Sequence, residues 1–422
     1  MVFESTPQAI QEFSVQMKRA IVLGAGIQGV SVALGLQRRG YAVALVDKAP
    51  DCLMRASFRN EGKIHMGFVY ANDSSFQTSA LMLRASLSFS RLLDEWTGVD
   101  IEWPALTSYP FMYVIARTSM VAPESLLGSY EKLQHEYKTV LKQEGGSYLG
   151  QRPASIWRPL SADQVAVWID KKFAVSGVQT VEVSLELEGF RHMIRATLAR
   201  SSAIEQCFSC SVESVIRTAN GFRVEGSRAD GTKWERHADI VVNCLWDGRL
   251  KVDEHMGIRP QRKWVYRLKY RLMGTLPRKL AGLPSLTVVL GPYGDVVMYP
   301  HANTYISWYP ACMRGWTDDV SVPQEWEQAC AGQIGDAEAD RIAREALSGF
   351  EEVVTGMVHA KIDVVDAGVI FSWGKTDIDD PGSELHERFH IGVHQHDGYF
   401  SIDTGKFTCA PFFAQQFLDC LG

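Results

Sequence analysis

The chain has 422 residues, more than a single hydrophobic core usually supports, so we expect at least two domains. Its composition is 46% hydrophobic and 22% charged, which excludes a disordered protein. The formal net charge of -6 argues against nucleic acid as the main partner, because no basic excess would neutralise phosphates. A local basic pocket for an anionic small molecule is still compatible with this charge.

No membrane anchor or secretion signal is evident in the sequence. No apolar run reaches the roughly 18 residues expected of a membrane span, and residues 1–16 lack the basic and apolar regions of a signal peptide. The eight cysteines are scattered, and the C-x-x-C pair Cys207 and Cys210 has no second pair, so a disulfide framework, a redox role or a zinc role is disfavoured. We therefore expect a cytoplasmic protein without a metal.

Residues 19–47 have the pattern of a dinucleotide-binding unit. An apolar run over residues 20–23 predicts a buried parallel strand, and a helical pattern ending at Gly40 leads to a second apolar strand over residues 41–46. Between the first strand and the helix stand three glycines in G-x-G-x-x-G spacing, namely Gly24, Gly26 and Gly29. This context makes an incidental glycine-rich turn improbable.

Each part of this unit has a physical role in holding a dinucleotide. The first glycine allows a tight turn, the second lets the backbone approach a pyrophosphate, and the third lets the helix pack close to the sheet. The helix N-terminus offers free N–H groups to the phosphates, and Asp47 is placed to accept hydrogen bonds from the ribose. Neighbouring candidates for cofactor contact are Ile27, Gln28 and Lys48. This fingerprint alone leaves NAD and FAD open.

A segment after Asp47 separates FAD from NAD. Residues 55–67 contain the run S-x-R-N-x-G-x-I-H-x-G, which resembles the D-amino-acid-oxidase-like superfamily of flavoenzymes. Members include glycine oxidase, FAD-linked glycerol-3-phosphate dehydrogenase and L-2-hydroxyglutarate dehydrogenase, whose branch the run resembles most. The resemblance implies that His65 lies close to the flavin ring and that the FAD is lined by Ser57, Asn60, Gly62, Lys63 and Ile64.

Two later segments fit the same resemblance. Expected strands over residues 212–217, 222–227 and 234–237 form a β-meander that feeds an apolar strand over residues 239–244. In the superfamily, the residue that matches Val212 holds the adenine through its backbone. The C-terminal run G-K-x-T-x-A-P resembles the turn before the last helix, which implies that Gly405, Lys406 and Phe407 face the flavin pyrimidine ring.

The chain departs from the superfamily at two positions. Trp246 stands where relatives have a small residue and a glycine, so either the loop is re-routed with Gly248 in that role or Trp246 stacks near the cofactor. Ile370 stands where many members carry the arginine of G-x-R-P, which grips a substrate carboxylate or phosphate. Because isoleucine cannot replace a guanidinium fork, a simple amino acid bound in the usual way is disfavoured.

We expect an α/β fold in two parts. A Rossmann-type FAD-binding domain, built on a parallel sheet plus a β-meander, comprises residues 17–75, 185–255 and 365–422. A second α+β substrate domain, built on a mainly antiparallel sheet, comprises residues 76–184 and 256–364. Its expected helices are 76–95, 124–142 and 324–347, and its expected strands are 111–115, 264–273, 286–290, 296–299 and 305–309.

Several residues are candidates for the chemistry. His65 is the best base, because histidine titrates near neutral pH, although it could also be a packed residue or only a donor to the ring. Arg388 and His390 lie in a run resembling a loop near the flavin in glycerol-3-phosphate dehydrogenase, so they are further catalytic candidates. An anion contact or a solvated strand face could be formed by Arg262, Arg267, Lys269 and Arg271.

Two more clusters of residues can each be interpreted in two ways. Aromatic residues of the expected substrate sheet could wall a ligand or form its core: Tyr293, Tyr299, Tyr305, Trp308 and Tyr309. Four histidines towards the C-terminus allow chelation geometrically, but a metal is disfavoured: His386, His390, His394 and His396.

The sequence predicts an FAD-dependent oxidoreductase with non-covalent FAD. It would take a hydride from a CH–OH or CH–NH carbon of a small or medium organic substrate onto flavin N5, and the S-x-R-N-x-G-x-I-H match favours CH–OH. The electron acceptor is oxygen or another molecule. Open alternatives are an amine or amino-acid oxidase that releases hydrogen peroxide, a flavin-binding protein with altered or lost oxidase activity, and an NAD-only dehydrogenase.

Overall fold

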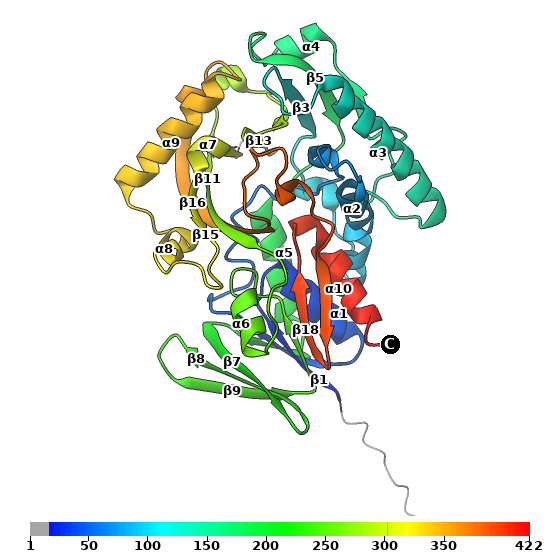
Figure 1. The fold of residues 1–422 in the computed structure, drawn as a ribbon, viewed down its shortest axis with the longest axis vertical. Coiled ribbons are helices and arrows are strands. Elements are labelled where there is room, and N and C mark those ends of the chain that lie inside the picture. The colour runs from blue at the N-terminus through cyan, green and yellow to red at the C-terminus, as the bar shows by residue number, and fades with distance from the viewer. Residues whose placement is uncertain (1–16, 302) are drawn as a thin grey trace, which may run out of the picture.

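The computed structural model describes residues 17–301 and 303–422, and it contains two large β-sheets, one above the other in Figure 1. The lower sheet has six strands in the order β17-β18-β10-β1-β2-β6. All neighbours are parallel except β17 and β18. The strands are β1 (Arg19–Leu23), β2 (Ala42–Val46), β6 (Ile204–Cys207), β10 (Ile240–Asn243), β17 (Gly392–His396) and β18 (Tyr399–Asp403). The expected absence of a signal peptide concerns residues 1–16, which lie outside the described residues.

Both faces of the six-stranded sheet are covered. On one face α1 packs against β1 and β2, and α10 and α2 pack against α1. On the other face lie the antiparallel meander β7-β8-β9 and the short helix α6. The helices are α1 (Ile27–Arg38), α2 (Gln77–Thr97), α5 (Leu187–Ala199), α6 (Arg249–His255) and α10 (Ala410–Asp419). The meander strands are β7 (Cys210–Thr218), β8 (Gly221–Arg228) and β9 (Lys233–Ala238). The expected meander is therefore present.

The second sheet has nine strands in the order β15-β11-β14-β13-β12-β3-β5-β4, with β16 paired to β11. Its pairings are antiparallel except between β12 and β3. The strands are β3 (Phe111–Ala116), β4 (Trp157–Pro159), β5 (Ala174–Thr180), β11 (Trp264–Thr275), β12 (Ser285–Val289), β13 (Gly294–Met298), β14 (Thr304–Trp308), β15 (Met313–Thr317) and β16 (Lys361–Trp373). This mixed architecture confirms the expected fold class.

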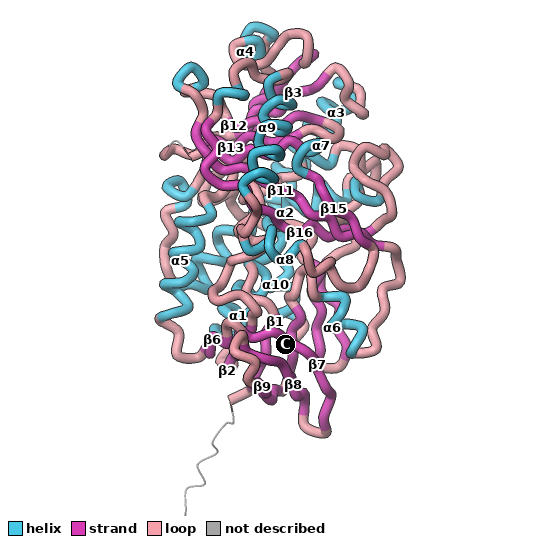
Figure 2. The backbone as a smooth tube through the Cα atoms, turned by 90° about the vertical axis from the view of Figure 1, so that its left-hand side faces the viewer, coloured by secondary structure: helices cyan, strands magenta, loops and turns pink. Residues whose placement is uncertain are grey.

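Five helices accompany the nine-stranded sheet within the described ranges, and Figure 2 shows α9 crossing it. They are α3 (Pro123–Gln143), α4 (Ala162–Ala166), α7 (Tyr309–Cys312), α8 (Trp326–Ala331) and α9 (Asp336–Glu351). The single helix expected over residues 324–347 is wrong. Its apolar period continues through the segment, but Gly332 adopts φ +80° and ends α8, so the chain turns before α9 begins.

The expected domain boundaries do not coincide with the sheets at two places. Residue 365 lies inside β16, whose whole length pairs with β11, so residues 365–373 belong to the nine-stranded sheet. The expected substrate segment 76–184 begins with α2, which packs on α1 and α10 beside the six-stranded sheet.

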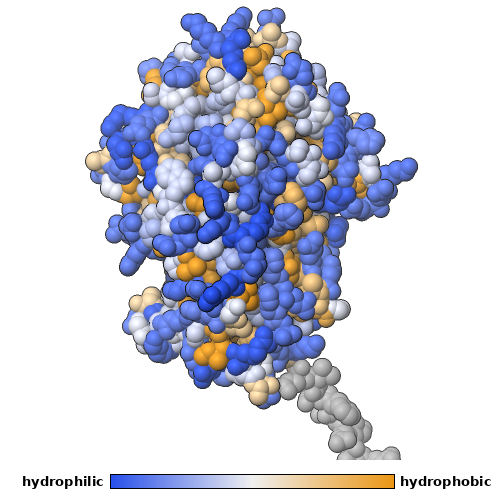
Figure 3. All heavy atoms as spheres, in the orientation of Figure 1, coloured by the Kyte–Doolittle hydropathy of each residue, from blue (hydrophilic) through white to orange (hydrophobic). Residues whose placement is uncertain are grey.

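The face of the molecule in Figure 3 is mainly hydrophilic with scattered apolar residues. No helix within the described ranges has the length and apolar character to cross a membrane.

Candidate functional site

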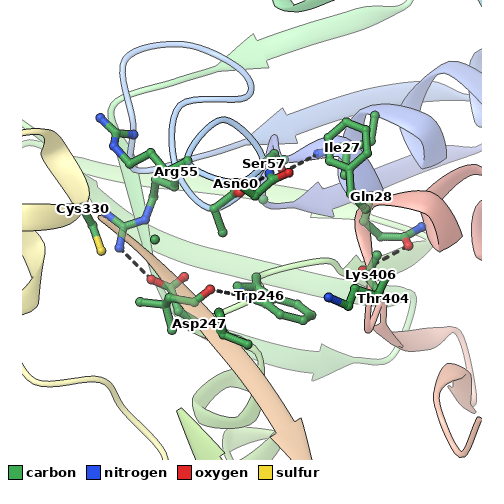
Figure 4. A pocket seen from close by; sticks show the side chains of 18 of the residues that line it. Ile27, Gln28, Arg55, Ser57, Asn60, Trp246, Asp247, Cys330, Thr404 and Lys406 are labelled. Carbon is green, nitrogen blue, oxygen red and sulfur yellow. Dashed lines mark hydrogen bonds and ion pairs between the residues drawn. The ribbon is translucent and has the colours of Figure 1, made fainter. Parts of the chain in front are cut away.

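A long cavity lies between the two sheets and opens to solvent. Its lining comes from the carboxyl ends of β1, β2 and β10, from the loop after β2, from β11 and β16, and from the segment that precedes α10. The space between its atoms, including the open mouth, is about 1460 Å³. Figure 4 shows part of its wall. The carboxyl ends of parallel strands are where α/β sheets bind dinucleotides.

The glycine turn at the start of α1 is packed too tightly for side chains. A Cβ on Gly29 would lie 1.7 Å from the Gly24 carbonyl oxygen, so the helix lies directly against the turn. A Cβ on Gly26 would lie 2.9 Å from Ser57 Oγ, and it would fill the space in front of the helix N-terminus. The Ile27 N–H donates to Ser57 Oγ at 2.9 Å, as Figure 4 shows. This cradle fits a pyrophosphate, because its free N–H groups and dipole favour an anion.

Asp47 directly follows β2 at the wall of the same cavity. Its carboxylate accepts hydrogen bonds from the backbone N–H groups of Ala25 at 2.6 Å and Ala49 at 2.8 Å. Burial raises the pKa of this carboxyl above its usual value. The neighbouring Lys48 forms an ion pair with Glu327 at 2.7 Å. A carboxylate fixed at the end of β2 is the group that a dinucleotide-binding site needs for ribose hydroxyls.

Charged contacts hold the loop after β2 to the segment that follows β10 and to α8. Arg55 donates to Asp247 at 2.6 Å and to Glu327 at 2.8 Å. Asn60 closes the loop on itself, because its side chain donates to the Ala56 carbonyl at 2.7 Å and accepts from the Gly62 N–H at 2.6 Å. The structure thus gives Asn60 a shaping role as well as a place on the wall.

Most of the cofactor residues predicted from the sequence line this cavity. They are Gly24, Gly26, Ile27, Gln28, Asp47, Lys48, Ser57, Asn60, Lys63, Gly405, Lys406 and Phe407. Four others are absent from its lining: Gly29, Gly62, Ile64 and Val212. Gly29 and Gly62 support the wall from behind through close backbone packing, whereas Val212 lies in β7.

Trp246 belongs to the wall, and a contact with β16 fixes its ring. Its Nε1–H donates to the Val369 carbonyl at 2.7 Å, and its ring meets that of Phe371 edge-on at 5.9 Å. Gly248 is absent from the lining. Of the two alternatives for this departure, the described geometry favours a tryptophan beside the cofactor cavity.

The segment before α10 closes the other end of the cavity. Gln28 joins it to α1, because its side chain accepts from Thr404 Oγ1 at 3.1 Å and donates to the Ala410 carbonyl at 3.1 Å. The pKa of Lys406 is lowered to about 8, because burial and the nearby charge of Arg388 outweigh the opposing effect of Glu61. Lys406 is therefore a cation that can lose its proton slightly above neutral pH.

A second cavity of about 940 Å³, its mouth included, adjoins the first. The wall common to both consists of Glu61, Lys63, His65, Lys269, Ile370, Arg388 and Lys406. His65 is 4% exposed, and neither ring nitrogen has a hydrogen-bond partner. Burial lowers its pKa, so the imidazole is neutral at neutral pH. A neutral, buried imidazole at the junction of two cavities can accept a proton from a ligand in either.

Three cations of the common wall have no carboxylate within 4 Å among the described residues: Lys269, Arg388 and Lys406. Lys63 differs, because it forms an ion pair with Asp295 at 2.7 Å. The other three basic residues of this run are paired: Arg262, just before β11, with Glu384, and Arg267 and Arg271 of β11 with Asp377 and Asp366. Because Arg267 and Arg271 are paired, Lys269 is the cation that β11 contributes to an anion site.

Other predicted site residues lie elsewhere. His390 is exposed and lines neither cavity, and its ring is tilted against that of Phe389 with the centroids 4.1 Å apart. Of the aromatic cluster, Tyr293 and Tyr309 line the second cavity and Tyr305 the first. No group of three or more potential metal ligands occurs within residues 17–301 and 303–422.

Cys207 and Cys210 are buried and unpaired at the junction of β6 and β7. Burial raises the pKa of the Cys207 thiol to about 12, so its thiolate is scarce at neutral pH.

Sequence reasoning missed two residues of the common site. Glu61 lies within the motif that identified His65, and its position four residues before the histidine was the signal that could have found it. Tyr70 lines the second cavity. No local pattern marks it, because its place depends on how the chain turns after Gly67.

Comparison with known proteins identifies the family. A family model described as FAD dependent oxidoreductase matches residues 19–402. The chain belongs to this family. The match confirms the superfamily that the sequence motifs resemble and FAD as its cofactor, and the cradle around Gly26 and Asp47 fits that dinucleotide.

Relatives of this FAD-dependent oxidoreductase are distant. Glycine oxidase from Geobacillus kaustophilus is 12% identical with a TM-score of 0.64, and the match covers 96% of this chain and 94% of that chain. L-alpha-glycerophosphate oxidase from Mycoplasma pneumoniae, with FAD bound, is 13% identical with a TM-score of 0.61. That match covers 96% of this chain and 95% of that chain. These likenesses show the fold. D-amino acid dehydrogenase from Cereibacter sphaeroides is 44% identical over 50 residues, and the chain matches only 12% of that relative's length.

Proposed function

We propose that the protein oxidises a carbon bearing a hydroxyl group in a small anionic substrate, with the second cavity as the substrate site. When bound, FAD supplies a hydride acceptor. The observation that carries the proposal is His65, a neutral imidazole with two unpartnered nitrogens at the wall shared by both cavities. Removing a hydride from an alcohol carbon requires a base for the hydroxyl proton, and His65 has the position and the charge state for it.

Glu61 supports this role by its position. Its Oε1 lies 3.7 Å from His65 Nε2, so an Nε2–H is directed toward a carboxylate and Nδ1 is left to accept the substrate proton. The imidazolium that forms is then next to a negative charge. The same division of labour between a base and an orienting carboxylate is found in catalytic triads.

The charge of the wall supports an anionic substrate. Lys269, Arg388 and Lys406 face the junction without carboxylate partners within 4 Å in the described part of the chain, and the isoleucine at position 370 lies between the two cavities. A buried group of cations raises the local concentration of anions and holds a carboxylate in place. The substrate therefore carries its anchoring group toward these side chains.

Oxidation of a CH–NH carbon is the second candidate, and it is supported by the local similarity to a D-amino acid dehydrogenase. An amine substrate must bind as the neutral amine, which a histidine of low pKa does not hinder. We expect non-covalent FAD and a cytoplasmic location, which the unpaired cysteines within the described residues support. The electron acceptor is oxygen or another molecule.

The test is anaerobic reduction of the purified flavoprotein, followed by loss of its visible absorbance. We expect bleaching by a 2-hydroxy acid in a panel that pairs each hydroxy acid with the corresponding amino acid. His65→Asn should retain the yellow cofactor and slow reduction by about 10²–10⁴-fold. Bleaching by amino acids alone would select the second candidate. A yellow protein that no member of the panel bleaches would contradict both.

A further inference from the structure

Tyr70 ends the short 3₁₀ helix Phe68–Tyr70, which follows the motif that contains His65. Its side chain lines the second cavity, and the residue is only 6% exposed. Its ring lies edge-on to that of His65, with the centroids 6.0 Å apart. The tyrosine therefore stands beside the proposed base on the substrate side.

The hydroxyl of Tyr70 has no hydrogen-bond partner. A buried hydroxyl without a partner has lost its hydrogen bonds to water and gained none, so such a group calls for an explanation. Two other tyrosines share this feature, Tyr130 and Tyr266, but neither lines either cavity. Tyr70 therefore combines an unsatisfied hydrogen-bond donor with a place on the cavity wall.

Arg388 is fixed next to the same turn. Its backbone N–H donates to Thr78 Oγ1 at 2.9 Å, at the start of α2. Ser79, the next residue of α2, donates its hydroxyl to the Gly67 carbonyl at 3.0 Å, and Gly67 begins the turn that carries Tyr70. These two contacts tie the backbone of Arg388 and the turn that carries Tyr70 to the same end of α2, and both residues line the second cavity.

We propose that Tyr70 is a substrate-binding residue whose hydroxyl, together with the Arg388 guanidinium, anchors a carboxylate of the substrate in the second cavity. This rests on the proposed function and adds the chemical class of the anchoring group. Burial raises the pKa of the phenol, so Tyr70 remains a donor over the physiological range. The pair supplies, from a loop and a turn, the anion contact that Ile370 on β16 cannot make.

The test uses the FAD-loaded protein and two probes of the same shape, benzoate and its uncharged analogue benzamide. Binding is measured by calorimetry. We expect the wild type to bind benzoate more tightly than benzamide. Tyr70→Phe should weaken benzoate by about tenfold or more, because a hydrogen bond to a charged group is lost, and it should affect benzamide less. The control Tyr130→Phe removes an equally buried, unpartnered hydroxyl away from both cavities, and it should bind benzoate as the wild type does.

Tyr70→Phe removes only a hydroxyl without a protein partner, so we expect an unchanged or higher melting temperature. Equal benzoate affinity in the wild type and Tyr70→Phe would overturn the proposal, as would a wild type that does not bind benzoate. Loss of benzoate binding in Tyr70→Phe, in a flavoprotein that no hydroxy or amino acid reduces, would keep the anchor and contradict the proposed reaction. Reduction by a hydroxy acid, with benzoate binding unchanged in Tyr70→Phe, would support the proposed reaction and contradict the anchor.

Discussion

Glu61 Oε1 lies 3.7 Å from His65 Nε2 in the wall between the two cavities, where both side chains are largely shielded from solvent. Burial lowers the pKa of the imidazole, the Glu61 carboxylate opposes this, and the cations Lys406 and Lys63 add to the lowering. In Glu61→Gln the opposing charge is gone, so the pKa of His65 should fall by roughly one unit or more.

The direction in which pH changes the rate of flavin reduction follows from the role of His65 as a base. Flavin reduction requires neutral His65, so the rate is lost as pH falls through the pKa of the imidazole. The acidic limb of the rate profile should therefore move to lower pH in Glu61→Gln, as measured by anaerobic stopped-flow reduction. The control Glu235→Gln, which changes an exposed carboxylate of β9, should leave the profile unchanged. An acidic limb that moves upward would contradict the assignment.

Gly26→Ala should weaken FAD binding without unfolding the protein. Gly26 has φ -70°, which alanine adopts without strain, so the effect comes from the added Cβ alone. That carbon would lie 2.9 Å from Ser57 Oγ, and it would disturb the hydroxyl that accepts from the Ile27 N–H. The measurement is the ratio of flavin to protein absorbance after purification. Gly128→Ala, in the middle of α3 with open space around it, is the matched control and should keep its full flavin content. A fully loaded Gly26→Ala protein would contradict the cradle.

The sequence was sufficient where neighbouring residues determine the structure. The strand, glycine turn and helix over residues 19–38 follow from a short apolar run and three spaced glycines. The helix expected over 324–347 was wrong because Gly332 interrupts a pattern whose period continues, and periodicity alone does not report φ. The boundary at 365 was misplaced because the pairing of β16 with β11 joins segments about 100 residues apart.

The site was predictable in part for the same reason. His65 was recognised because a motif surrounds it, whereas Tyr70 and Lys269 meet it only through folding. Lys269 lies on β11, more than 200 residues from His65, and its importance depends on the partners that its neighbours find. A single sequence does not contain those pairings.

Asp377 should hold the loop of residues 374–391, which carries Arg388 over the second cavity. Its carboxylate accepts from Arg267 at 2.5 Å, from Trp316 Nε1 at 3.0 Å and from the Tyr309 hydroxyl. Arg267 is buried while Asp377 is partly exposed, so Asp377→Asn should cost about 2–3 kcal/mol, below the usual cost of breaking a fully buried pair.

The loop should then open more often, which limited proteolysis with trypsin can report. Asp377→Asn should be cut faster than the wild type after Lys375 or Arg388, with the fragments identified by mass spectrometry. The exposed neighbour Asp379, changed to Asn, is the control and should be cut at the wild-type rate. Equal cutting rates together with an unchanged melting temperature would show that Asp377 does not hold the loop.

Lys406 should make anion binding depend on pH above neutrality. Its pKa is lowered to about 8, first by burial and then by Arg388 and Lys269, with Glu61 opposing them. An anion in the adjoining cavity binds the protonated lysine better. The favourable charge is therefore fully present below the pKa and lost as pH rises through about 8.

Benzoate affinity of the FAD-loaded protein should accordingly fall between about pH 7 and about pH 9, whereas that of uncharged benzamide should not. Lys406→Met should bind benzoate more weakly at the lower pH and lose most of the dependence. Lys138→Met, on the exposed face of α3, should retain the wild-type curve. The phenol of Tyr70 keeps its proton over this range because its pKa is raised, and a guanidinium stays protonated in proteins. A pH-independent wild type would therefore mean that Lys406 does not face the bound anion.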